Sequence, residues 1–207
     1  MLAALARISG VRPLGWIASI YVDFFRTTPL LVQLVWIYFA LPILIGESLD
    51  GVQAGALGMS LYAGSFLAEI IRAGILSVER GQSEAALALG MTSAQVMRRI
   101  ILPQAVVRML PPIASTFISL IKDSSLASIV SVPELMRQSQ ALASFTQRNM
   151  EALTVAAILY FGLTYPLSLL VNALHRRFGL GTVESKQEHP AELGTTEGEA
   201  NAVPVEV

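Results

Sequence analysis

Residues 82–105 read QSEAALALGMTSAQVMRRIILPQA, a polar stretch between apolar ones. Its first half is a run of good helix formers, and Gly90 then supplies the residue type best suited to the left-handed position that ends a helix. Thr92 and Gln95 have the spacing of a capping box, which predicts a second short helix that begins there and ends near Pro103. The stretch therefore predicts two short helices joined by a turn, between two hydrophobic segments.

The composition of the whole chain is that of a membrane protein. Of its 207 residues, 54% are hydrophobic and 14% are charged, and the mean hydropathy is +0.61. A soluble domain carries about 25% charged residues, so an ordinary soluble protein is excluded. The chain has no cysteine and two histidines, which leaves no disulfide, thiolate ligand or histidine cluster. We expect no metal, no other cofactor and no nucleic-acid partner.

Four segments are apolar enough to be spans, because a bilayer core needs about 20 apolar residues per helix. They are residues 29–46, 52–76, 106–132 and 152–174. If they cross in alternation, most of the basic residues fall on one side, and the positive-inside rule makes that side cytoplasmic. The same side holds the C-terminus and the loop 77–105, which we call the elbow. The sequence thus predicts an all-α, polytopic membrane helical bundle.

Three further segments complete the predicted organisation. Residues 1–28 are expected to be a cytoplasmic segment that retains only the trailing end of a first span. Residues 131–149 predict a short amphipathic helix on the far side of the membrane, with Ser131 and Glu134 at capping-box spacing. Residues 184–207 are rich in Glu, Gly, Thr and Pro without apolar periodicity, which predicts a disordered acidic cytoplasmic tail.

The elbow has two interpretations from its residue types alone. Ala85 and Ala86 are small, so the surface of another protein could approach the backbone closely. Glu84 lies near the start of the first helix, where it complements the helix dipole and stays available to a partner. Alternatively, the elbow lies on the membrane surface with Arg98 and Arg99 at the lipid headgroups. Both interpretations stay open on this chemistry.

The spacing of seven residues in the elbow resembles a known motif. Glu-Ala-Ala, three residues, Gly, nine residues, Ile, one residue and Leu-Pro form the EAA loop of ABC-importer permeases. All seven positions match: Glu84, Ala85, Ala86, Gly90, Ile100, Leu102 and Pro103. In that family the loop forms coupling helices that contact a cytoplasmic ATPase. The resemblance implies that Glu84, Ala85, Ala86 and Gly90 make this contact.

Longer stretches resemble the polar amino-acid permeases, the histidine, glutamine and arginine type of uptake system. They are residues 21–34, 67–75 and 108–135, and the resemblance covers about residues 5–180. This sequence departs from the family's usual residues at Thr27, Tyr62, Ala63, Ser115 and Thr116, positions that bear on which amino acid is carried. The family usually has five spans, so the type I transmembrane fold is expected here with the first span mostly missing.

The same resemblance implies what the chain does and with what. It implies a permease domain over residues 29–183, in a bacterial cytoplasmic membrane, that moves polar amino acids. The implied partners are ABC ATPase subunits, an extracytoplasmic substrate-binding protein, a second permease copy or paralogue, and membrane lipid. The chain lacks GxxxxGK[ST], the phosphate-binding loop, so the permease is not expected to hydrolyse ATP. An alternative is an ion-coupled secondary transporter or channel that acts without an ATPase.

Besides Arg108 near the start of residues 106–132, two groups of charges fall within predicted spans. Each such charge costs about 2.5–3.5 kcal/mol on insertion scales. Lys122 and Asp123, followed by Ser124 and Ser125, interrupt an otherwise apolar run. A broken helix that lines a substrate path explains them. Alternatively, the span ends at Lys122, whose ammonium reaches the outer interface, and Asp123 caps the next segment.

Glu69 and Arg72 form the second group. They are three residues apart, and on a helix this spacing places both on one face. An ion pair between them is therefore expected rather than a substrate contact.

Overall fold

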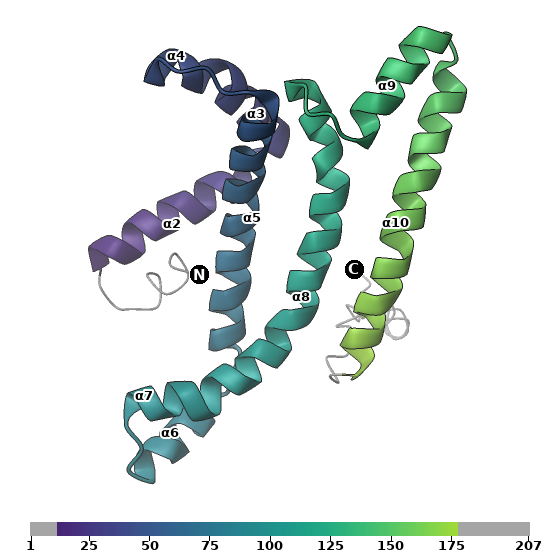
Figure 1. The fold of residues 1–207 in the computed structure, drawn as a ribbon. Helices are drawn as coiled ribbons and strands as arrows, with labels where there is room; N and C mark the ends of the chain where they lie inside the picture. The colour runs from purple at the N-terminus through teal and green to yellow at the C-terminus, as the bar shows by residue number, and fades with distance from the viewer. Residues whose placement is uncertain (1–11, 178–207) are drawn as a thin grey trace, which may run out of the picture.

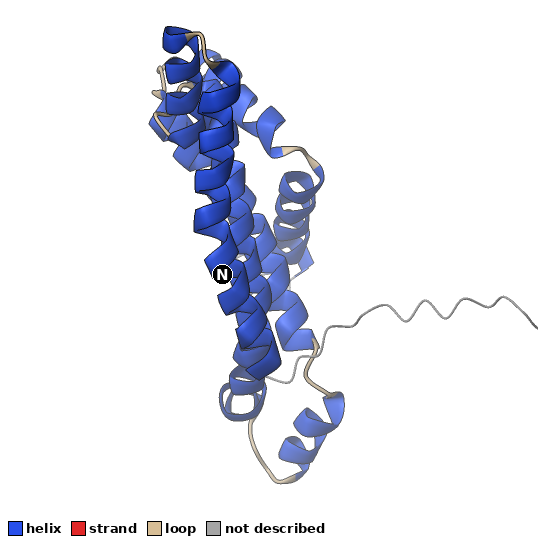
Figure 2. Ribbon diagram, turned by 90° about the vertical axis from the view of Figure 1, so that its right-hand side faces the viewer, coloured by secondary structure: helices blue, strands red, loops and turns tan. Residues whose placement is uncertain are grey.

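The structure is a computed structural model, and it describes residues 12–177. Helices make up this part of the chain, with short connections and no strand within it (Figures 1 and 2). The elements are α2 (Arg12–Thr27), α3 (Leu30–Val35), η1 (Trp36–Ala40), α4 (Leu41–Ile45), α5 (Gly51–Leu76), α6 (Arg80–Ala88), α7 (Ser93–Val96), η2 (Met97–Ile101), α8 (Leu102–Asp123), η3 (Ser124–Val130), α9 (Leu135–Thr146) and α10 (Asn149–Arg177). The predicted all-α fold is confirmed. The tail 184–207 and residues 1–11 lie outside the described part.

Three continuous helical stretches are long and apolar enough to cross a membrane. They run over Gly51–Leu76, Ser93–Val130 and Asn149–Leu174, so three of the four predicted spans are confirmed. The fourth, residues 29–46, does not form a span by itself. Leu30–Ile45 is bent by 106° against the preceding helix Pro13–Thr27, and the two together make at most one broken span.

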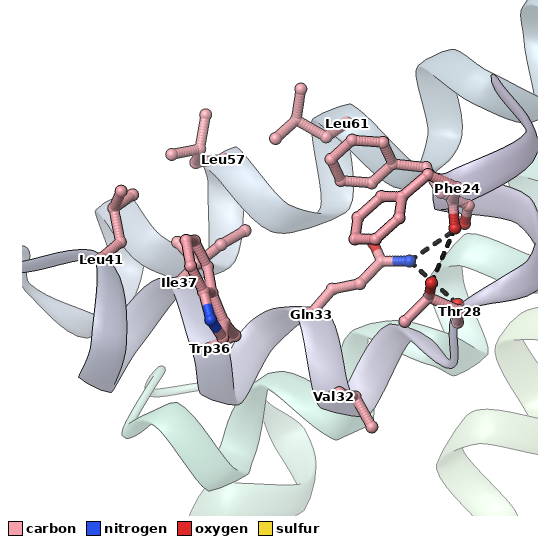
Figure 3. A pocket seen from close by; sticks show the side chains of 10 residues that line it. Phe24, Thr28, Val32, Gln33, Trp36, Ile37, Leu41, Leu57 and Leu61 are labelled. Carbon is pink, nitrogen blue, oxygen red and sulfur yellow. Dashed lines mark hydrogen bonds between the residues drawn. The ribbon is translucent and has the colours of Figure 1, made fainter. Parts of the chain in front are cut away.

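The bend between α2 and α3 has a local cause in Pro29. Proline has no N–H and disfavours the helical conformation of the residue before it, so the helix cannot continue. Pro29 adopts an extended conformation, with φ −60° and ψ 135°. The buried side-chain amide of Gln33 then donates to the carbonyls of Phe25, at 3.0 Å, and Thr28, at 2.9 Å (Figure 3). A polar residue in an apolar segment is thus used to hold the bend.

The next two prolines do not end their helices, contrary to the prediction for Pro103. A five-residue π-helical segment precedes each: η1 lies before Pro42 and η2 before Pro103. The wider turn moves the backbone away from the proline ring, which would otherwise clash with the carbonyl four residues back. The elbow's second helix therefore continues through Pro103 into α8 and forms one stretch of 38 residues up to Val130.

The predicted capping role of Ser131 is wrong. Ser131 has φ 64° and ends η3 in the left-handed conformation. Pro133 keeps Val132, the residue before it, out of the helical region, so no helix starts at Ser131. Helix α9 begins at Leu135, and Glu134 caps it. The Glu134 carboxylate accepts hydrogen bonds from the backbone N–H groups of Met136, at 2.7 Å, and Arg137, at 2.6 Å. The amphipathic helix itself is confirmed.

Helix α5 is at the centre of the bundle and packs through its small residues. The buried positions along it are Ala54, Gly55, Gly58, Ser65, Ala68 and Gly74. A Cβ added at Gly58 would lie 2.8 Å from the Leu34 side chain of α3, and one added at Gly55 would lie 3.0 Å from Val132. Membrane helices associate without a hydrophobic driving force, so close backbone approach supplies the packing energy. The small residues decide which elements surround α5.

Candidate functional site

The elbow has the turn geometry that its sequence predicts. Gly90 has φ 82°, and its N–H donates to the Leu87 carbonyl at 2.9 Å. The Met91 N–H donates to the Ala86 carbonyl at 3.2 Å. This pair of bonds is the Schellman motif, which satisfies carbonyls that the end of a helix leaves free. Residue Gly90 therefore fixes the angle between α6 and α7.

The start of α7 is equally well defined. The Thr92 backbone N–H donates to Gln95 Oε1 at 2.9 Å, and the Gln95 N–H donates to Thr92 Oγ1 at 3.4 Å. Both bonds of the predicted capping box are present. Figure 1 places α6 and α7 together at the end of the molecule opposite α4 and α9. The elbow thus projects from one end of the bundle on a short, internally bonded turn.

The motif residues of the elbow do not all face the same way. Glu84, Ala85 and Gly90 are exposed, whereas Ala86 is buried. Ile100, Leu102 and Pro103 lie in η2 and at the start of α8, where they shape the exit from the elbow. Ala86 therefore packs inward, and its small side chain serves the elbow's own packing.

Two leucines of the elbow, Leu87 and Leu89, are exposed, which the sequence analysis did not predict. Leu89 is 85% exposed and Leu87 is 48% exposed. An apolar side chain that projects from a polar, water-facing element is a feature of contact surfaces. Its signal in the sequence is the pair of leucines beside Gly90, but only the turn geometry shows that they point outward.

The predicted substrate-path residues divide into two pairs. Lys122 and Asp123 line a cavity of about 340 Å³ between α5 and α8. Ser124 and Ser125 are not among its lining residues, and their hydroxyls donate to the carbonyls of Ile121 and Lys122, each at 2.7 Å. The cavity is also lined by Tyr62, Phe66, Ser115, Thr116, Ser119 and Leu120.

The cavity bears on the two interpretations of the Lys122–Asp123 break. The α-helix ends at Asp123 and tightens into the 3₁₀ segment η3. The Asp123 side chain makes no capping hydrogen bond to η3. Its carboxylate faces the cavity beside the hydroxyl-bearing Tyr62 and Ser119. The capping role that the second interpretation gives to Asp123 is therefore absent, and the substrate path stays a prediction.

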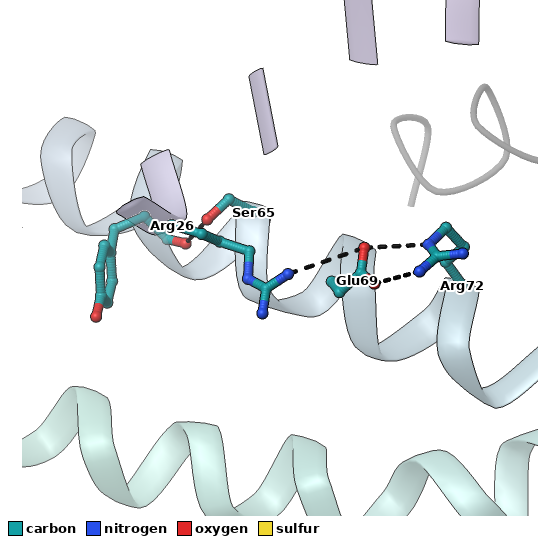
Figure 4. A network of polar contacts seen from close by, with 5 residues as sticks. Arg26, Ser65, Glu69 and Arg72 are labelled. Carbon is teal, nitrogen blue, oxygen red and sulfur yellow. Dashed lines mark hydrogen bonds and ion pairs between the residues drawn. The ribbon is translucent and has the colours of Figure 1, made fainter. Parts of the chain in front are cut away.

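Glu69 and Arg72 of α5 form a network of charges with Arg26 of α2 (Figure 4). The predicted ion pair is confirmed: Arg72 donates through Nη2 to Glu69 Oε1 at 2.5 Å and through Nε to Oε2 at 3.1 Å. Arg26 of α2 adds a longer contact to Glu69 Oε2 at 4.0 Å. Its guanidinium also lies 5.4 Å from the ring centroid of Phe66, a cavity residue. Mutual pairing offsets the cost of these charges in a span.

A bundle of apolar helices with a motif-bearing elbow and a polar cavity defines the class: the membrane-spanning permease subunits of ABC importers. The chain belongs to the family described as binding-protein-dependent transport system inner membrane component, which matches residues 1–180. Permease subunits of this family carry no ATPase motif, and a partner ATPase hydrolyses the ATP. The chain is accordingly an inner-membrane transport subunit rather than an enzyme.

Similar proteins support this membership over most of the chain. The L-cystine transport system permease protein TcyB of Bacillus subtilis (strain 168) is 44% identical, with 86% of this chain and 76% of the relative covered. The probable glutamine ABC transporter permease protein GlnM of the same organism is 42% identical, with 84% and 80% covered.

Solved structures agree. One of an amino acid ABC transporter with histidines has a TM-score of 0.80 and 38% identity, and the match covers 84% of this chain and 81% of that one. The MetNI methionine ABC transporter in an inward-facing conformation, at 23% identity and a TM-score of 0.67, shares the fold, with 86% and 82% covered.

Proposed function

We propose that this permease subunit carries polar amino acids into the cell and that its elbow receives the ATPase. Relatives named for cystine, glutamine and arginine transport, at 36–44% identity over more than four-fifths of this chain, support the substrate class. The cavity between α5 and α8 supports it chemically. A free amino acid carries both charges, and Lys122 and Asp123 offer both signs beside hydroxyl groups.

The observation that carries the ATPase contact is the exposed surface of the elbow. Glu84, Ala85, Leu89 and Gly90 face outward from a short turn that is fixed by its own hydrogen bonds. A rigid, projecting element transmits a displacement, whereas a flexible one absorbs it. Burial of Leu89 against a partner contributes about 1.5–3 kcal/mol, and Glu84 adds charge complementarity at the rim.

The assembly that follows has four kinds of component. ATPase subunits bind the elbow on the cytoplasmic side, which is also the side of the C-terminus. A substrate-binding protein delivers the amino acid to the opposite end, near α4 and the turn between α9 and α10. A second permease, either a copy of this chain or a paralogue, completes the translocation path, because the three or four spans within residues 12–177 enclose little space. ATP-driven closure of the ATPases then moves the elbow and, through it, the spans.

The elbow contact is tested by charge reversal in the purified complex. Glu84→Lys should weaken co-purification of the ATPase several-fold and lower ATP-driven uptake in proteoliposomes, because the reversed charge meets the surface that paired with the carboxylate. Glu151→Lys, the same change on an exposed residue at the other end of the molecule, should leave ATPase association unchanged. Normal association and uptake in Glu84→Lys would refute the contact.

The substrate path is tested with a panel of radiolabelled L-cystine, L-glutamine and L-arginine. Asp123→Asn keeps the size of the side chain but removes the charge that would bind the ammonium group. The expected rise in KM for uptake is about 10-fold or more, since a hydrogen bond to a charged group contributes about 1.5–3 kcal/mol. Glu47→Gln, on an exposed loop residue, is the matched control. An unchanged KM in Asp123→Asn would remove the cavity from the path.

A further inference from the structure

Arg108 links the end of α5, which leads into the elbow, to α8, which leads out of it. It lies on α8, and its Nη1 donates to the backbone carbonyl of Ser77, the residue that follows α5. The same nitrogen lies 3.3 Å from Ser77 Oγ. The two residues are 31 positions apart in sequence, so this is a tertiary contact that bridges the base of the elbow.

The acceptor of this contact is a carbonyl that needs a partner. The last carbonyls of a helix have no partner within the helix and carry the negative end of its dipole. The Ser77 N–H is already bonded to Ala73 at 2.9 Å, and its hydroxyl donates to Gly74 at 2.8 Å, so Ser77 continues the last turn of α5. A guanidinium satisfies such a carbonyl through both its charge and its several N–H donors.

Close packing surrounds the Arg108 contact. Val78, Ala105 and Met109 form a buried cluster between the end of α5 and α8. A Cβ added to Gly74 would lie 2.4 Å from Met109 Cγ, so the two helices approach each other there with no room for a larger residue. The α5–α8 contact is therefore tight at the base of the elbow, and Arg108 is its polar component.

The same two helices form the walls of the polar cavity. Tyr62 and Phe66 come from α5, whereas Ser115, Thr116 and Asp123 come from α8. The helical stretch from Ser93 to Val130 is continuous, so a displacement of α7 passes directly into the α8 wall. The α5 wall moves with it only if the contact between Ser77 and Arg108 holds α5 against α8.

We infer that Arg108 is a positioning residue for coupling: its bond to the Ser77 carbonyl makes α5 and α8 move together when the elbow is displaced. The inference rests on the proposed ATPase contact of the elbow. Loss of the bond leaves the ATPase-binding surface of the elbow in place but lets α8 move without α5. ATP is then hydrolysed with less amino acid transported.

The test compares Arg108→Met with Arg108→Lys in the complete importer, reconstituted with its ATPase subunits and binding protein. Methionine keeps the length and apolar contacts of the side chain without its donors, whereas lysine keeps a charged donor. In Arg108→Met we expect normal ATPase co-purification and hydrolysis, with about 10-fold fewer labelled amino acids transported per ATP, the factor that corresponds to about 1.4 kcal/mol. Arg108→Lys should restore at least half of the ratio. Arg137→Met, at an exposed position of α9, should not change it.

A distance measurement provides a readout besides transport. Because the chain has no cysteine, spin labels at Leu76→Cys on α5 and Val106→Cys on α8 report the separation of the two helices. In the otherwise unchanged protein, ATP should leave that distance distribution narrow, and in Arg108→Met it should broaden or shift.

An unchanged transport ratio together with an unchanged distance in Arg108→Met would overturn the inference. So would loss of the ATPase, or of folded permease, from Arg108→Lys, since that result assigns Arg108 to folding. Glu84→Lys in the same assay separates the two ideas, because it reports on the elbow contact whatever Arg108 does.

Discussion

The substitution Gly51→Ala tests the packing of α5 against η3. Gly51 is the first residue of α5, directly after the capping residue Asp50. A Cβ at Gly51 would lie 2.1 Å from the carbonyl oxygen of Val130 and 3.2 Å from the carbonyl carbon of Ser131. These are backbone atoms, so no side-chain rotation can relieve the clash. The two elements must separate by about 1 Å to reach ordinary contact distance.

The cost of Gly51→Ala follows from that clash. Overpacking of a well-packed contact costs typically about 1–3 kcal/mol, and the gain in helix propensity from Gly to Ala offsets less than 1 kcal/mol of it. For a chain of this size, each kcal/mol moves Tm by about 2–4 °C. We therefore expect the purified protein in detergent to unfold several degrees lower than the unchanged protein, by at most about 12 °C. Unfolding is followed by tryptophan fluorescence or by retention of the folded peak in size-exclusion chromatography.

The control for Gly51→Ala is the same change elsewhere in a span. Gly162 lies in α10, and a Cβ there would meet nothing within 4 Å. Gly162→Ala should therefore leave Tm unchanged or raise it, because alanine has the higher helix propensity. Equal destabilisation by both substitutions, or none by Gly51→Ala, would refute the argument that backbone approach at Gly51 holds α5 and η3 together.

Three further predictions concern single hydrogen bonds and turns. Tyr160→Phe removes the phenol that donates to Glu134 at 2.8 Å and should destabilise the protein by about 1–2 kcal/mol, whereas an unchanged Tm would show that the capping bonds of Glu134 suffice. Thr92→Ala removes the acceptor of the Gln95 N–H and should destabilise α7 by about 1 kcal/mol. Hydrogen exchange at the start of α7 should then be faster, and an equal exchange rate would contradict this prediction. Gly90→Ala places a Cβ on a residue with φ 82° and should destabilise the turn by about 1 kcal/mol or more. ATPase association should fall as well if the turn angle sets the contact. Gly81→Ala, at an open position of α6, should have neither effect.

The sequence determined the features that arise within a few residues of one another. Apolar runs predicted α5, α8 and α10, and a spacing of three residues predicted the capping box of Thr92 and Gln95. Gly90 predicted the left-handed turn, and the three-residue spacing of Glu69 and Arg72 predicted their ion pair. In each case the partners are neighbours on the same helix or turn, so the backbone geometry alone brings them together.

Prolines mark the limit of that reasoning. Pro29 breaks its helix by 106°, whereas the helix continues through Pro42 and Pro103 behind π-helical segments. All three carry the same local signal, a missing N–H and a bulky ring. The proline alone therefore does not say whether the chain bends or widens. At Pro29 the bend is held by the buried Gln33 amide, which bonds to the carbonyls of Phe25 and Thr28.

The tertiary structure alone decided the contacts between distant parts of the chain. The cavity of Lys122 and Asp123 needs α5 opposite α8, and the Arg108 contact joins residues 31 positions apart. Such contacts depend on how closely the helix backbones approach each other. The glycines of α5 permit a close approach, but they do not determine which helix packs there. Local chemistry therefore predicts the elements and their turns, whereas the site that they build depends on long-range packing that no short stretch of sequence contains.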